Sequence, residues 1–299
     1  MALWQGKSRG GVTGHKVFVF IIKNLGTSFA YFFLKIIAVY YFFSFGKPFM
    51  SSYFYFNKIH RYNKIKSLLY IYKSYCMLGK VLVDKVALLS DVGKQFLRNY
   101  DNDHIIKELI DGNTGGIIIN AHVGNWEIAG QLLEYFDTKI NILMFDSEHQ
   151  RIRNYLSNVL ADKNVNFIII NDGIGHLQQI EKALKNKELI AMNGDRFLAG
   201  NLTVSCNFLG HDAKFPLSPY YIAGKYNVPV VYAFAMKEGK NFYRFFATPK
   251  RYIENFYSMK KREQGLKDAV NDYAAALEKI VCKYPLQWFN YYNFWSKTE

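Results

Sequence analysis

The feature that most constrains this chain is the stretch of residues 115–131, which reads GGIIINAHVGNWEIAGQ. Its apolar run at 117–119 is typical of a strand buried on both faces of a sheet. Apolar residues at helical spacing follow at 126–136, with a turn between the run and the helix. Open α/β sheets bind their ligands at turns of this kind, at the carboxyl end of a strand. The sequence therefore predicts a functional site in this turn, which contains His122.

His122 is followed five positions later by a carboxylate, Glu127, in the predicted first turn of the helix. A carboxylate there would hold one ring nitrogen of the histidine as a donor and leave the other nitrogen as a base. A hydroxyl group deprotonated by that base would attack an activated acyl carbon. The alternative is a buried histidine beside an unrelated surface glutamate, and the residues alone leave both interpretations open.

Four further residues are candidates for contact with a substrate. Asp195 and Arg196 end a predicted strand in a glycine-containing loop, so we expect them at the same sheet edge as His122. An arginine there suits a phosphate group or a phosphopantetheine arm, although an ion pair within the loop is the alternative. Gly124 and Asn125 lie at the predicted helix start, where free amides would stabilise an oxyanion. Asn125 has a competing role as the helix N-cap.

Strand and helix patterns alternate from residue 103 to the end of the chain, which predicts an α/β fold with a mainly parallel sheet flanked by helices. We expect an α/β domain over residues 91–299. Strands are predicted at 116–120, 140–145, 166–170, 189–193, 228–235 and 242–247, and helices at 103–110, 126–136, 148–160, 174–185, 218–226 and 262–283.

The N-terminal part of the chain is apolar and rich in aromatic residues. After a polar, flexible lead-in at 1–14, residues 15–45 are strongly hydrophobic, but Lys23 and Lys35 interrupt them. A lysine at mid-bilayer costs roughly 2.5–3.5 kcal/mol on insertion scales. Residues 15–90 are therefore expected to form a helical region that associates with the membrane surface, with a single span as the competing interpretation.

The charge and composition narrow the class of partner. Lys and Arg number 38 against 24 Asp and Glu, which gives a net charge of +14 and favours an anionic membrane, nucleic acid or an acidic carrier protein. Aromatic residues make up 17% of the chain, which favours the membrane over nucleic acid. The three cysteines lie far apart and predict neither a disulfide framework nor a metal site. No metal or redox cofactor is expected.

Four blocks, in order, resemble one known family. The run NAHVGNWE at 120–127 resembles the H-x4-[D/E] signature of the bacterial lipid A late acyltransferases, the lauroyl and myristoyl transferases. This family is related to the lysophospholipid and glycerol-3-phosphate acyltransferases. The other matching blocks are AMNGDR at 191–196, the segment 207–219, and YPLQWF at 284–289, so the resemblance covers most of the chain.

The resemblance implies an enzyme at the cytoplasmic face of a bacterial inner membrane. It would move a fatty acyl group from an acyl carrier protein thioester to a hydroxyl of a lipid acceptor, by default a lipid A precursor or related glycolipid. His122 would be the general base and Glu127 its partner. The proposed substrate-binding residues are Gly124, Asn125, Asp195 and Arg196.

One departure from the family leaves the acceptor open. Relatives commonly carry an arginine after the helix predicted at 148–160, but here that region reads NVLADKN, and Arg151 and Arg153 lie earlier. An acceptor without a phosphate, such as an aryl polyene or flexirubin-type pigment lipid, would explain this difference, and a lysolipid is a further alternative acceptor. An alternative of another class is a non-catalytic, basic membrane-binding protein on the same scaffold.

Overall fold

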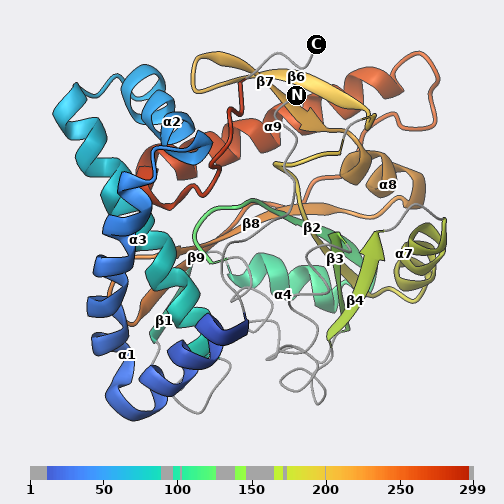
Figure 1. Ribbon diagram of the computed structural model, residues 1–299. Helices are drawn as coiled ribbons and strands as arrows, with labels where there is room; N and C mark the ends of the chain where they lie inside the picture. Colours follow the sequence, from blue (N-terminus) through green and yellow to red (C-terminus); the bar gives the residue numbers. More distant parts are fainter. Residues whose placement is uncertain are drawn as a thin grey trace.

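The computed structural model describes residues 12–88, 97–101, 103–125, 139–145, 165–170, 174–198 and 200–295 (Figure 1). A seven-stranded sheet with the strand order β1-β9-β8-β2-β5-β3-β4 forms its centre. All neighbouring strands are parallel except the antiparallel pair β8 and β9, which confirms the predicted α/β class. The strands are β1 (Leu97–Asp101), β2 (Gly116–Asn120), β3 (Ile140–Phe145), β4 (Val165–Ile170), β5 (Leu189–Asn193), β8 (Val230–Lys237) and β9 (Phe242–Ala247).

The middle strand, β2, determines where the site lies. All five of its residues are buried, as expected for the apolar run GIIIN. It pairs in parallel with β5 on one side and β8 on the other, and Asn120 lies opposite Asn193 in register. Because parallel strands end at the same edge of a sheet, the segments after β2 and β5 leave the sheet side by side.

Helices cover both faces of the sheet. One face carries α4 (Asp103–Asp111), and the other carries α7 (Gly175–Lys185), α8 (Ser218–Tyr226) and α9 (Arg262–Lys283). The buried side of α9 includes Leu266, Val270 and Tyr273, as its helical spacing predicts. The helices predicted at 126–136 and 148–160 lie outside the described residues.

The N-terminal helices form a layer at one end of the sheet, on the left of Figure 1. They are α1 (Val12–Phe43), which is broken at Gly26, α2 (Lys47–Phe54), a π-helical turn (Tyr55–Ile59) and α3 (Lys64–Leu88). Helix α1 begins at Val12, so residues 12–14 of the predicted flexible lead-in are helical. The domain boundary predicted at residues 90 and 91 lies outside the described part of the chain.

Two features of the fold were not predicted. Strand β1 is one, and the antiparallel hairpin of β6 (Thr203–Phe208) and β7 (His211–Pro216) is the other. The hairpin buries Phe208 and Phe215 in the main core while Ser205, Asn207 and His211 stay exposed, so its strands lack a continuous apolar run. After α9, the C-terminal segment returns Trp288 to the same core, where it is 3% exposed.

Candidate active site

The turn that leaves β2, residues 121–125, is fixed between the C-terminal segment and β8. The carbonyl oxygen of His122 accepts a hydrogen bond from the backbone N–H of Phe289 at 2.9 Å, and the N–H of Gly124 donates to the carbonyl oxygen of Gln287 at 2.8 Å. The Gln287 side chain accepts from the backbone N–H of Lys237 at 2.9 Å and donates to its carbonyl oxygen at 2.8 Å. A buried glutamine therefore joins the turn to the end of β8.

Gly124 is required for this close approach. Its φ is +54°, and a Cβ atom at this position would lie 2.0 Å from the carbonyl oxygen of Ala235 in β8. The next residue, Asn125, donates its backbone N–H to that same oxygen at 2.8 Å. Both amides are occupied by backbone carbonyl groups, so neither is free in this structure for the oxyanion role expected from the sequence.

His122 makes a double contact with a buried carboxylate. Its Nδ1 lies 2.8 Å from Oδ1 of Asp195, and its backbone N–H donates to Oδ2 at 3.0 Å. The Asp195 side chain is 0% exposed and the His122 side chain is 14% exposed. Asn290 donates a third hydrogen bond to Oδ2 of Asp195, at 3.2 Å. The register of β2 and β5 brings these side chains together, since each lies two residues past the end of its strand.

The electrostatics of the pair fix the position of a proton. Burial raises the pKa of the Asp195 carboxyl group, but the charge and hydrogen bonds of His122, together with Arg196, outweigh burial and bring that pKa below its usual range. Asp195 is therefore ionised near neutral pH and only accepts hydrogen bonds. In neutral His122 the proton consequently lies on Nδ1, and Nε2 retains its lone pair. The described residues contain no hydrogen-bond partner for Nε2.

Arg196 binds the C-terminal segment. Its Nε donates to the side-chain oxygen of Asn290 at 3.2 Å, and its Nη2 donates to the carbonyl oxygen of Phe289, also at 3.2 Å. The guanidinium group lies over the ring of Tyr292, with 5.9 Å between Cζ and the ring centroid. Arg196 thus stabilises the segment that fixes the His122 turn. Two of its N–H groups are already used in these bonds and are not available to an acceptor.

The predicted site residues come together only in part. His122, Gly124, Asn125, Asp195 and Arg196 meet at the expected sheet edge, whereas Glu127 lies outside the described residues. The sequence interpretation assigned Asp195 to the acceptor, but the structure places this carboxylate behind the imidazole, 0% exposed.

Sequence reasoning did not single out Gln287 or Asn290 as site residues. The only signal was that Gln287 belongs to the YPLQWF block. Within the parts of the chain that the structure describes, no group of three or more His, Cys, Asp or Glu residues is arranged to hold a metal ion.

A histidine held by a buried carboxylate, at the carboxyl edge of a mainly parallel sheet, is an arrangement that can activate a hydroxyl group. The family model of the bacterial lipid A biosynthesis acyltransferases matches residues 75–297. The chain belongs to this family, and the protein is therefore a lipid acyltransferase.

One solved structure similar to this chain is that of the 1-acyl-sn-glycerophosphate acyltransferase from Thermotoga maritima. It is 14% identical, covers 86% of this chain and 97% of its own, and has a TM-score of 0.39. No curated protein matched the chain.

The contact between His122 and Asp195 predicts the effect of Asp195→Asn. A carboxamide can donate to Nδ1, which favours the tautomer with the proton on Nε2, so we expect kcat to fall by about 10²–10⁴-fold. Steady-state transfer assays check this, with circular dichroism to verify the fold. The matched control, Asp212→Asn, changes an exposed carboxylate on β7 and should leave kcat unaltered. Wild-type kcat in a folded Asp195→Asn protein would show that the contact is not used in transfer.

Proposed function

We propose that this protein transfers a fatty acyl group from an acyl carrier protein thioester to a hydroxyl group of a lipid acceptor. In this proposal His122 is the general base, and Asp195 orients its ring and stabilises the imidazolium. The observation that carries the proposal is the double contact of His122 with a buried carboxylate that lies 2.8 Å from Nδ1. That contact leaves Nε2 as the nitrogen able to take a proton from the acceptor.

The reaction proceeds by direct attack and needs no acyl-enzyme. Nε2 of His122 removes the proton of the acceptor hydroxyl as its oxygen forms a bond to the thioester carbonyl carbon. The tetrahedral intermediate then collapses, the carbon–sulfur bond breaks, and the departing thiolate takes the proton back from the imidazolium. Asp195 remains a carboxylate throughout, because its negative charge lowers the energy of the imidazolium.

Glu127 lies outside the described residues and stays in this proposal as a second candidate carboxylate. The sequence interpretation paired it with His122, but one ring nitrogen can be held by only one of the two carboxylates while the other nitrogen acts as the base. Because Asp195 holds Nδ1, we assign the orienting role to Asp195.

The default acceptor is a lipid A precursor or a related glycolipid, in keeping with the family. The contacts of Arg196 support a second candidate, a membrane lipid without a phosphate such as an aryl polyene or flexirubin-type lipid; a lysolipid stays as a further alternative. Its Nε and Nη2 already donate to Asn290 and Phe289, so phosphate binding there would compete with existing hydrogen bonds. Transfer assays with both classes of acceptor decide between them.

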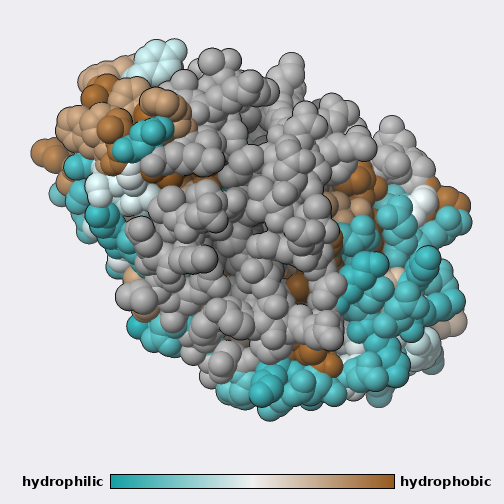
Figure 2. Space-filling view, turned by 90° about the horizontal axis from the view of Figure 1, so that it is seen from below, coloured by the Kyte–Doolittle hydropathy of each residue, from teal (hydrophilic) through white to brown (hydrophobic). Residues whose placement is uncertain are grey.

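The lipid acceptor requires contact with a membrane, and α1 offers a suitable surface. Within the described residues, one helix, Asn24–Phe43, is long and apolar enough to cross a membrane. Hydrophobic side chains gather on the left of Figure 2, the side on which α1 and α2 lie in Figure 1. The exposed apolar residues of α1 lie at helical spacing and are Phe20, Leu25, Phe29, Phe32, Ile36, Val39, Tyr40 and Phe43.

The packing of α1 favours a helix that lies on the membrane over one that spans it. Tyr31 and Leu34 are buried on its opposite side, and Phe42 packs its ring against Tyr72 of α3. A spanning α1 would take α3 into the bilayer with it, although α3 carries the exposed Lys64, Lys66 and Lys73. Charged side chains inside a bilayer are costly. We therefore propose that α1 lies in the cytoplasmic leaflet of the inner membrane.

The proposed function is tested by acyl transfer with the purified protein. His122→Ala should lower kcat by at least about 10²–10⁴-fold, the effect of removing a positioned general base. Radiolabelled acyl carrier protein and lipid extracts from a deletion strain provide the assay. His211→Ala, which removes an exposed histidine on β7, is the control. If the folded His122→Ala protein transferred acyl groups at the wild-type rate, the proposed mechanism would be wrong.

The membrane surface is tested by changing Phe29, Phe32, Ile36 and Phe43 to Gln together. A buried apolar side chain contributes about 1.5–3 kcal/mol, so losing four of them should release most of the protein from anionic vesicles in a co-sedimentation assay. Because these side chains are exposed, the fold should survive. The matched control changes Ile174, Leu202, Tyr257 and Met259 to Gln, since these residues are also exposed but lie outside the N-terminal helices. Equal binding by both variants would rule out this surface.

The donor is tested with the same acyl chain on acyl carrier protein and on coenzyme A. A protein of net charge +14 attracts an acidic carrier protein over a larger surface than it attracts coenzyme A. We expect a higher kcat/KM with the carrier protein, and a preference that shrinks at high salt because exposed charges are screened. Equal kcat/KM values at low salt would indicate that the positive charge serves only the membrane.

A further inference from the structure

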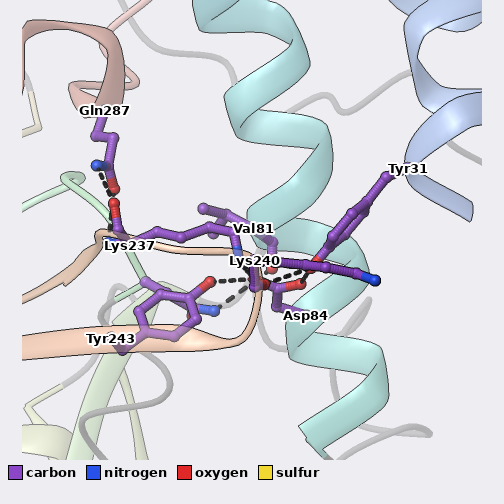
Figure 3. Close-up of polar contacts among 8 residues, drawn as sticks. Tyr31, Val81, Asp84, Lys237, Lys240, Tyr243 and Gln287 are labelled. Atoms are coloured by element: carbon purple, nitrogen blue, oxygen red, sulfur yellow. Dashed lines mark hydrogen bonds and ion pairs between the residues drawn. The ribbon is translucent and has the colours of Figure 1, made fainter. Parts of the chain in front are cut away.

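A buried ion pair joins the N-terminal helices to the sheet on the β8 side of the His122 turn (Figure 3). Nζ of Lys237, the last residue of β8, donates to Oδ2 of Asp84 in α3 at 2.6 Å. The Asp84 side chain is 0% exposed and the Lys237 side chain 4%. Taking both charges out of water is costly, and a well-packed apolar pair often stabilises a fold equally well. The ion pair therefore calls for an explanation beyond stability.

The remaining groups of the pair are satisfied by hydrogen bonds. Asp84 accepts from the Tyr243 hydroxyl of β9 at Oδ2, 2.5 Å away, and from the Tyr31 hydroxyl of α1 at Oδ1. The Lys237 ammonium also donates to the carbonyl oxygen of Lys240. Four segments of the chain thus meet at one carboxylate, and a fully satisfied buried network of this kind fixes its members in a single arrangement.

This network is connected to the His122 turn through Asn125, which is 3% exposed. The Asn125 side chain donates to the carbonyl oxygen of Val81, three residues before Asp84 in α3, at 3.4 Å. Its backbone N–H donates to Ala235 of β8 at 2.8 Å. The turn is therefore bonded both to α3 and to β8.

A second connection runs through Gln287. Its side chain binds both backbone groups of Lys237, and its own carbonyl oxygen accepts from the N–H of Gly124. The position of the turn consequently depends on how α3 and the end of β8 lie relative to each other. The ion pair between Asp84 and Lys237 fixes that relation directly.

We propose that Asp84 and Lys237 are positioning residues for acyl transfer, which hold the His122 turn in place by fixing the α1–α3 helix pair to β8. This inference rests on the proposed role of His122 as the base. Tyr31 connects the network to α1, whose other side carries the exposed apolar residues. The same ion pair therefore links the proposed membrane-contacting helix to the reacting histidine.

The test is a double-mutant cycle with Asp84→Asn, Lys237→Met and the double variant. Displacing a reacting group by about 1 Å costs on the order of 10²-fold, so each single variant should lower kcat by about 10–100-fold with KM little changed. Because the two residues act as one unit, the double variant should be no slower than the slower single variant. Wild-type kcat in a folded single variant, or losses that multiply in the double variant, would overturn the proposal.

The variant Tyr232→Phe is the control that separates a loss of stability from a loss of positioning of the His122 turn. The buried hydroxyl of Tyr232, a residue of β8, donates to the carbonyl oxygen of Ala269 in α9 at 2.8 Å, and within the described residues it makes no hydrogen bond to the turn. This control should lower the melting temperature about as much as Tyr243→Phe does, yet leave kcat unchanged. Tyr243→Phe should lower kcat. Equal kcat in the two phenylalanine variants counts against positioning.

Amide hydrogen exchange decides the question if the charge variants do not fold, and it does not depend on the role of His122. Tyr243→Phe should accelerate exchange at Gly124 and Asn125 by about 10-fold relative to Tyr232→Phe, because Tyr243 belongs to the network that holds the turn and Tyr232 does not. Equal exchange rates would overturn the positioning role. A normal rate of transfer by His122→Ala, by contrast, would overturn the proposed function and leave this measurement valid.

Discussion

The backbone pairing between residues 122–124 and residues 287–289 is the constraint on which the rest of the site depends. It joins the turn after the central strand to the C-terminal segment through two hydrogen bonds, and Trp288 anchors that segment in the main core. With the turn held in this way, His122 faces Asp195, which leaves the neighbouring strand. Asn290 and Arg196 then bind one another across the same junction. All of these contacts lie next to the pairing, so they share its position in the fold.

The sequence predicted the parts of the fold that depend on local pattern. Strands such as β2 and β5 bury continuous apolar runs, and α9 repeats its apolar residues at helical spacing, so both signals are contained in a short window. The β6–β7 hairpin was missed because Ser205 and Asn207 on one strand and His211 on the other face solvent, which leaves too few apolar residues for a pattern. A strand that is half exposed depends on the surface against which it packs.

The site was harder to predict because its contacts depend on strand order. The pairing of His122 with Asp195 follows from the adjacency of β2 and β5, which no spacing along the chain reveals. Nearness in sequence favoured Glu127 instead. The sequence contains one weak signal that Asp84 has a special role, because it is the sole acidic residue of α3. Its partner Lys237 lies far along the chain and could be recognised only once the helices were packed on the sheet.

Because the C-terminal segment fixes the His122 turn, the order in which the chain is synthesised affects when the site can form. A ribosome synthesises α1 and α3 before the strands that precede His122 and Asp195, and it synthesises residues 287–290 later than both. Domains generally begin to fold from the N-terminus during translation. The surface that we propose contacts lipid is therefore available to a nascent chain before the histidine turn can be fixed. In a chain that met lipid this early, the His122 turn would not yet be fixed, and the proposed acyl-transfer centre would assemble at the membrane surface.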